Sequence, residues 1–144
     1  MDRAVTVGGA GIFGLWQALT LARAGFRVRL IESSAEAFAT SISRWAGAMV
    51  APDCEVEAAP PLIRSLGQES RALWRATYPD LINRGSLVVA APRDRGELTR
   101  FARLTTGGQP VEAAQIDALE PALAGRYAQG LYYADEAHME TPDA

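Results

Sequence analysis

A glycine-rich loop near the N-terminus constrains the fold of this 144-residue chain more than any other feature. The loop, residues 9–14, has the spacing G-x-G-x-x-G. The short apolar run before it, residues 4–7, predicts a buried parallel strand. Apolar residues at helical spacing follow it and predict a helix over residues 12–24, with Gly25 just past its end. A glycine loop between a strand and a helix is typical of a phosphate-binding turn.

Each glycine of this loop has a distinct physical task. Gly9 permits a tight turn, and Gly11 lacks a Cβ, so the backbone can approach a pyrophosphate closely. Gly14 lets the helix pack against the strand. The N-terminus of the helix offers free N–H groups and a partial positive charge to phosphates. The loop therefore predicts a site for a dinucleotide.

An acidic residue follows at the spacing that this fingerprint requires. Alternating apolar and basic residues at 26–31 predict a second strand that ends beside Glu32. A right-handed crossover makes the two strands parallel and yields one βαβ unit. Glu32 would accept hydrogen bonds from ribose hydroxyls and repel a 2′-phosphate, which disfavours NADP. NAD and FAD share this half-site, so the loop does not choose between them. A plain turn with a surface glutamate is the structural alternative.

The rest of the chain predicts further helices and strands. Helices are expected over 62–78, from Asp94 to about 104, and near 116–119, strands at 87–90 and 130–133, and a loop at 53–61. We expect residues 1–84 to be the N-terminal part of a nucleotide-binding domain and residues 85–144 to begin a second, α+β domain. The run Thr141-Pro142-Asp143 predicts a further helix start, so the chain is expected to continue as a longer protein of which this part alone is marginally stable.

Composition excludes several classes of site. The net charge of −3 offers nothing to a nucleic acid, and one cysteine and one histidine are too few for a disulfide or a zinc site. Cys54 is expected to be an inert thiol, His138 and Glu140 to lie on the surface, and Trp16 and Trp74 to lie in the core. The uncharged residues 4–22 contain four glycines, which favours a strand and helix over a membrane span. We therefore expect a cytoplasmic protein without a membrane or nucleic-acid partner.

A second segment resembles a known family. Residues 43–52, with their AGAMVAP run, resemble the segment along the flavin in the D-amino-acid oxidase superfamily, and most of all in the glycine oxidases of thiamine biosynthesis. Six residues also stand at the spacing of the extended fingerprint of FAD-dependent oxidoreductases: Gly14, Ala18, Leu21, Gly25, Val28 and Glu32. The resemblance implies an α/β fold in which a Rossmann-like FAD-binding βαβ unit precedes the substrate domain, with FAD as the cofactor.

The resemblance also implies where the cofactor lies. It places Gly9, Gly11, Ile12, Phe13 and Gly14 in the phosphate loop and Glu32 and Ser33 at the ribose. It places Ser43 and Arg44 at the pyrophosphate, with Thr40 and Ser41 as competitors for that position. It places Gly47, Ala48 and Met49 beside the isoalloxazine ring, with Met49 on the substrate side.

The implied activity is the oxidation of an amine. In this family a small amino acid, such as glycine, sarcosine or a D-amino acid, gives its α-hydrogen to the flavin as hydride, and the imine then hydrolyses. The catalytic residues are expected in a C-terminal half beyond these 144 residues, so this part alone is expected to be inactive. Two alternatives stay open: a non-catalytic nucleotide-binding remnant and an NAD-dependent dehydrogenase.

Overall fold

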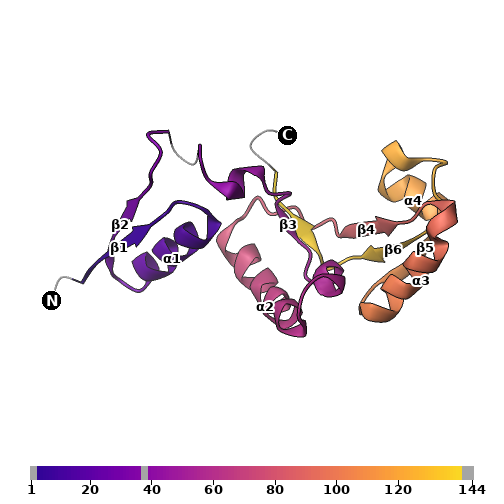
Figure 1. The fold of residues 1–144 in the computed structure, drawn as a ribbon, viewed down its shortest axis with the longest axis horizontal. Coiled ribbons are helices and arrows are strands. Elements are labelled where there is room, and N and C mark those ends of the chain that lie inside the picture. Colours follow the sequence, from indigo (N-terminus) through magenta and orange to yellow (C-terminus); the bar gives the residue numbers. More distant parts are fainter. Residues whose placement is uncertain (1–2, 37–38, 141–144) are drawn as a thin grey trace. The chain divides into compact units, whose positions relative to one another are not determined.

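The computed structural model describes residues 3–36 and 39–140, which form two compact units (Figure 1). One unit draws on Met1–Ala48 and Glu140–Ala144, and the other is Met49–Met139. The expected division at residues 84 and 85 concerned the domains of a complete enzyme and stays a prediction. The helix start expected at Thr141-Pro142-Asp143 lies outside the described residues.

The N-terminal unit is the predicted βαβ arrangement. Strand β1 (Ala4–Gly8), helix α1 (Ile12–Arg23) and strand β2 (Arg27–Ile31) follow one another, and a short 3-10 helix, η1 (Ile42–Trp45), comes after them. The strands pair in parallel, from Ala4 with Arg27 to Gly8 with Ile31. Gly25 has a φ of 83°, its N–H donates to the carbonyl of Ala22, and the N–H of Phe26 donates to the carbonyl of Leu21. This left-handed glycine and its two hydrogen bonds end α1 where the sequence predicted.

The expectation that β1 is a buried strand is wrong for this unit. Residues of β1 alternate between exposed and half-buried, and Leu30 and Ile31 of β2 are 37% and 47% exposed. Among the described residues of the unit only Ala10 and Gly14 are buried, and Trp16, expected in the core, is half-buried. The physical reason is that one helix covers this two-stranded sheet, so its apolar residues have few neighbours.

The second unit contains the remaining elements. They are β3 (Met49–Val50), η2 (Cys54–Glu57), α2 (Pro61–Thr77), β4 (Ser86–Val89), η3 (Pro92–Asp94), α3 (Arg95–Leu104), β5 (Gln109–Glu112), α4 (Ala113–Leu119), η4 (Pro121–Leu123), β6 (Gln129–Tyr133) and β7 (Ala137–His138). Strand β6 is the centre of an antiparallel sheet in the order β4-β6-β5, and β3 pairs antiparallel with β7. The five helices and strands predicted here are present within a few residues of their expected bounds, whereas β3, β5, β7 and η2 were not predicted.

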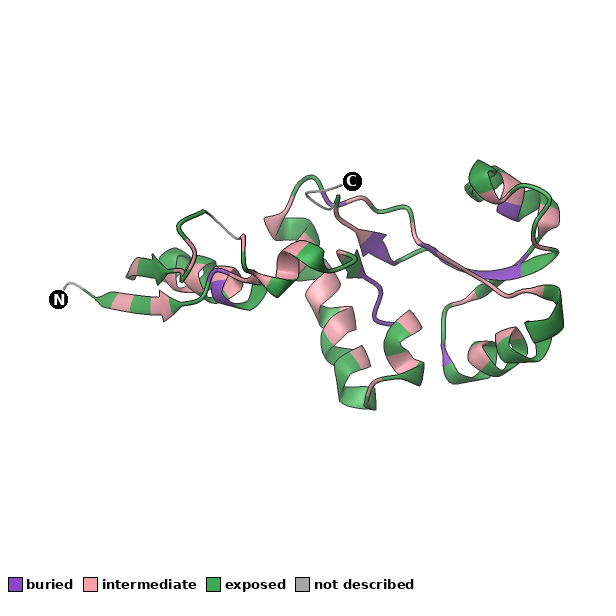
Figure 2. Cartoon of the chain, turned by 45° about the horizontal axis from the view of Figure 1, so that its top comes forward, coloured by how far each residue is buried: buried purple, intermediate pink, exposed green. Residues whose placement is uncertain are grey.

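One core cluster of the second unit lies around the β3–β7 pair, and further buried residues, among them Ile116 and Tyr133, lie at the three-stranded sheet. Val50, Leu81 and Ala137 are buried in the β3–β7 cluster, and Trp74, which was expected in the core, is half-buried and packs against them from α2. Figure 2 shows that the buried residues also continue along the segment after β3. Another stripe of α2 is exposed to solvent: Leu62, Leu66 and Leu73 are 63%, 51% and 55% exposed. None of the helices among the described residues is long and apolar enough to cross a membrane.

Candidate nucleotide-binding site

The glycine loop has the close approaches that its spacing predicts. Gly9 has a φ of +90°, which favours glycine, and its N–H donates to the Ile31 carbonyl at 2.7 Å. A Cβ on Gly14 would lie 1.9 Å from the Gly9 carbonyl oxygen, so no larger residue fits there. The loop is thereby held against the end of β2, and α1 begins at Ile12.

The Glu32 carboxylate links the end of β2 to this loop. Its Oε2 accepts a hydrogen bond from the Ala10 N–H at 2.7 Å. Its Oε1 accepts from the N–H and the hydroxyl of Ser33, at 2.7 and 2.9 Å. The Ala10 N–H and then the Ser33 hydroxyl are the main causes that lower the pKa of Glu32 to about 2. The carboxylate is therefore charged at neutral pH and sits where the sequence predicted a ribose-binding acid.

Two serine hydroxyls lie at the N-terminus of α1. The Ile12 N–H donates to Ser43 Oγ at 2.9 Å, and the Ser43 N–H donates to Ser41 Oγ at 3.3 Å. A Cβ on Gly11 would come within 3.2 Å of Ser41 Oγ and 3.4 Å of Ser43 Oγ. The structure therefore brings Ser43 to the phosphate loop, and its competitor Ser41 with it. Amide and hydroxyl donors at a helix N-terminus are the groups that hold a diphosphate.

The structure also shows the surroundings of other predicted cofactor residues. The Arg44 guanidinium lies over the Trp45 ring at 5.8 Å from its centroid. Phe13 is 76% exposed, and Ala48 has a φ of 50°, which is unusual for a residue with a Cβ. Met49 begins β3 in the second unit, where it pairs with His138 and is 61% exposed. The roles of these residues at a cofactor stay predictions.

The sequence did not predict that the Ala10 N–H would contribute to this site. This N–H fixes the Glu32 carboxylate, although the motif assigns position 10 no role because any residue can occupy it. A backbone donor carries no residue-type signal. Only the spacing between the loop and Glu32 could have indicated this bond, since that spacing brings the end of β2 to the loop.

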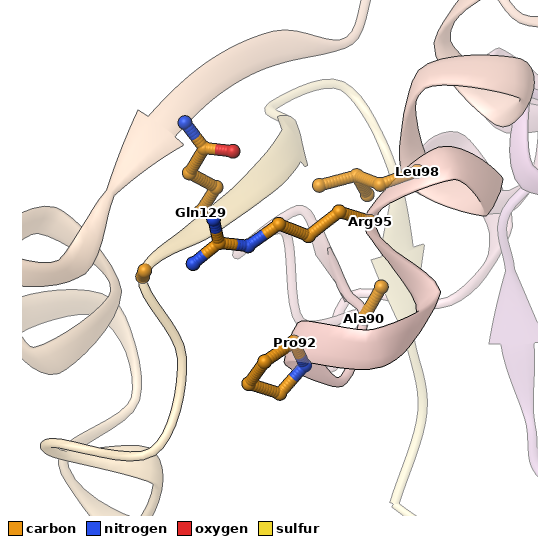
Figure 3. Close-up of a pocket in the computed structure, with 6 residues that line it drawn as sticks. Ala90, Pro92, Arg95, Leu98 and Gln129 are labelled. Atoms are coloured by element: carbon orange, nitrogen blue, oxygen red, sulfur yellow. The ribbon is translucent and has the colours of Figure 1, made fainter.

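Two cavities formed by described residues lie outside the glycine loop. Figure 3 shows a pocket in the second unit where the Arg95 side chain reaches toward Gln129, beside Ala90, Pro92 and Leu98. Its volume of about 10 Å³ is the room that one water needs. A shallow hollow of about 410 Å³ lies over the first residues of β1 and β2. Ligands of parallel sheets bind at the opposite, carboxyl ends of the strands, where the glycine loop lies.

Three further predictions meet the structure outside this site. Cys54 donates from Sγ to Glu136 Oε2 at 3.2 Å, and burial, with that contact, raises the pKa of the thiol well above its usual range, as expected for an inert cysteine. His138, expected on the surface, is half-buried in β7, where its backbone N–H donates to the Ile82 carbonyl. Asp94, where a helix was expected to start, is the N-cap of α3; it makes no cap hydrogen bond, and its carboxylate pairs with Arg93.

Comparisons with known proteins agree with this geometry. Residues 4–144 match the family DAO, FAD dependent oxidoreductase. A protein of Rhizobium etli described as a thiamine biosynthesis oxidoreductase, ThiO, is 43% identical over 141 residues, which are 97% of this chain and 43% of that protein.

Two solved structures show the same fold. The glycine oxidase of Bacillus cereus matches with a TM-score of 0.77 at 20% identity, over 99% of this chain and 42% of that one. The glycine oxidase of Geobacillus kaustophilus matches with a TM-score of 0.77 at 24% identity, over 99% of this chain and 41% of that one. The chain thus spans less than half of the relatives it matches. With its βαβ unit and its glycine loop, the chain belongs to the DAO family of FAD-dependent oxidoreductases.

Proposed function

We propose that this chain supplies the part of a flavoenzyme that binds the adenosine diphosphate half of FAD. The enzyme would oxidise the amine of a small amino acid such as glycine, sarcosine or a D-amino acid. The observation that carries the proposal is the Glu32 carboxylate, held charged at the carboxyl end of β2 by the loop N–H of Ala10. The 43% identity to a ThiO protein supports an oxidoreductase with a role in thiamine biosynthesis.

The donor and acceptor groups of the N-terminal unit fit this cofactor. Glu32 and Ser33 would hold the ribose hydroxyls. The Ile12 N–H and the Ser43 and Ser41 hydroxyls would hold the diphosphate, because they already lie together at the start of α1. Gly9, Gly11, Phe13 and Gly14 would shape the loop, and Arg44 would neutralise phosphate charge. Gly47, Ala48 and Met49 would lie along the isoalloxazine.

When bound, FAD supplies the acceptor for the substrate hydride. The described residues would bind and orient it, and Met49 would shape the substrate side of the site. We assign no catalytic residue within this chain, since it spans 43% of its ThiO relative and the groups that hold an amino-acid carboxylate would lie in the other part. We infer a cytoplasmic enzyme whose partner is a small-molecule amine.

An anaerobic reduction experiment tests this activity. The polypeptide that contains this chain is purified with FAD and mixed without oxygen with glycine, sarcosine or D-alanine. We expect the yellow flavin absorption to bleach with at least one of these amines. A protein that binds NAD and carries no flavin would overturn the proposal in favour of a dehydrogenase. A flavin that none of the amines reduces would overturn the proposed substrate class but keep the cofactor.

A further inference from the structure

The turn that follows β3 is held by a buried carboxylate from a distant part of the chain. Glu136 is 0% exposed. Its Oε1 accepts from the N–H groups of Asp53 and Cys54, at 2.9 and 3.0 Å, and its Oε2 accepts from the Cys54 thiol at 3.2 Å. These three donors are uncharged, and Glu136 lies 83 residues from Asp53. A buried carboxylate is costly unless such bonds satisfy it, so losing either side leaves polar groups unpaired.

Helix α2 holds the same turn from its other side. The Asp53 carboxylate is buried and accepts from Arg64 Nε at 3.0 Å, Gln68 Nε2 at 2.9 Å and Arg71 Nη1 at 3.4 Å. Gly67 lies on that stripe of α2, and a Cβ there would be 2.5 Å from Pro52 Cβ. The turn is thus fixed by side chains that come from two different elements.

Glu136 also lies next to the strand that pairs with β3. Strand β7 starts at Ala137, which pairs with Val50, and His138 pairs with Met49. The segment 49–54 is therefore held at both ends by residues 136–138: by main-chain pairing at Met49 and Val50, and by the carboxylate at Asp53 and Cys54. Moving the Glu136 carboxylate would move the turn, and with it the strand that carries Met49.

We propose that Glu136 is a positioning residue that sets the place of Met49 beside the flavin. This inference rests on the proposed function, which puts Met49 on the substrate side of the isoalloxazine. Because Glu136 is fully buried, it would contact neither substrate nor cofactor directly. It acts through the hydrogen bonds to Asp53 and Cys54, because these fix the turn that immediately follows β3.

The first arm of the test reads the Glu136 contact without any flavin. Cys54 is the single cysteine of these 144 residues, so peptide mapping after treatment with a thiol reagent reports on it specifically. In Glu136→Ala we expect labelling of Cys54, and exchange of the Asp53 and Cys54 amide hydrogens, to speed up by about tenfold or more. Asp135→Asn, a neighbouring exposed acid, is the matched control and should leave both rates unchanged. Equal rates in Glu136→Ala and wild type would overturn the inference.

The second arm reads the position of Met49 in the FAD-loaded protein, well below its melting temperature. We expect Glu136→Ala to change the visible circular dichroism of the flavin. Glu136→Gln should keep the wild-type spectrum, since the glutamine Oε1 can still accept from the N–H groups of Asp53 and Cys54. If Glu136→Ala does not fold, Glu136→Asp, which withdraws the carboxylate by one methylene, takes its place with the same expected change. A variant that only melts earlier, with the wild-type flavin spectrum, would show a purely structural role and overturn the inference.

A companion variant separates this inference from the proposed function. Met49→Leu should itself alter the flavin spectrum, and its effect should shrink in the Glu136→Ala background if the two residues act together. Additive effects would overturn the coupling. A wild-type protein that takes up no flavin would overturn the proposed function and the role of Met49, while the labelling arm would still report whether Glu136 holds the turn.

Discussion

Each of the two units of this chain is stabilised by a different kind of interaction. In the N-terminal unit the buried residues among those described are Ala10 and Gly14, and its loop is held by close glycine approaches and by backbone N–H groups that donate to Glu32 and Ser43. The second unit buries apolar side chains together with two carboxylates, Asp53 and Glu136, which accept bonds from distant donors. A site built from backbone geometry follows a short local motif, whereas a core built from side-chain bonds depends on contacts that are far apart in sequence.

The largest expected effect is in the second unit, at Asp53. Asp53→Ala would leave Arg64 and Arg71 without their carboxylate, although these side chains are only 22% and 16% exposed. We expect the free energy of unfolding to fall by about 3 kcal/mol, as measured by urea denaturation. The matched control is Asp94→Ala, because Asp94 pairs with an exposed arginine and should cost less than about 1 kcal/mol. Similar losses in both variants would contradict the view that buried side-chain bonds hold this unit.

The next effect tests the backbone geometry of the N-terminal unit. Gly14→Ala would place a Cβ 1.9 Å from the Gly9 carbonyl, so α1 must shift away from the loop. We expect a loss of about 2 kcal/mol in stability and weaker FAD binding. Gly96→Ala in α3 is the control, since nothing lies within 4 Å of its Cβ, and alanine should add about 0.5 kcal/mol there. If Gly14→Ala also stabilises the protein, the close approach does not exist.

The acid titration of Glu32 reports on the hydrogen bonds that hold the N-terminal unit. Its pKa is about 2 in the folded protein against a usual 4.5, so its bonds stabilise the fold above pH 4.5 and are lost as the pH falls through about 2. Ser33→Ala should raise the pKa, because the Ser33 hydroxyl donates to the carboxylate. Ser34→Ala should leave it unchanged, because Ser34 donates through its backbone N–H. NMR titration of the carboxyl carbon measures all three, and a wild-type midpoint near 4.5 would contradict the Ala10 bond.

The smallest effect concerns the strained backbone at Ala48. Its φ of 50° costs energy for any residue with a Cβ, so Ala48→Gly should raise the free energy of unfolding by about 0.5 kcal/mol. Ala46 has an ordinary φ of −74°, and Ala46→Gly should instead lower it by about 0.5 kcal/mol. Thermal denaturation shows whether each variant is more or less stable than wild type. A loss of stability in both variants would contradict the strain at Ala48.

The N-terminal unit could be predicted from the sequence because its signals are local. The loop glycines, the helix-ending Gly25 and the acid at the end of β2 each require a particular backbone conformation or spacing, and the structure has them. Its exposure could not be predicted. The apolar run of β1 indicated burial, but the amount of burial depends on what packs over the sheet.

The second unit was predicted only in its longer elements. Strand β5 was missed because Pro110 argues against a strand, and an edge position tolerates it. Strands β3 and β7 have two residues each and no periodicity. The bonds between Glu136 and the turn at Asp53 join residues 83 positions apart, and no motif announces them.

We expect the binding of FAD to depend most on the Glu32 carboxylate and the glycine loop. Calorimetric titration with FAD and with NAD should show a clear preference of the protein for FAD, and Glu32→Gln should weaken FAD binding by about tenfold or more. The control variant Glu36→Gln removes a nearby exposed charge and should bind FAD as the wild type does. Equal binding of FAD by Glu32→Gln and wild type, or a preference for NAD, would contradict the account of this site.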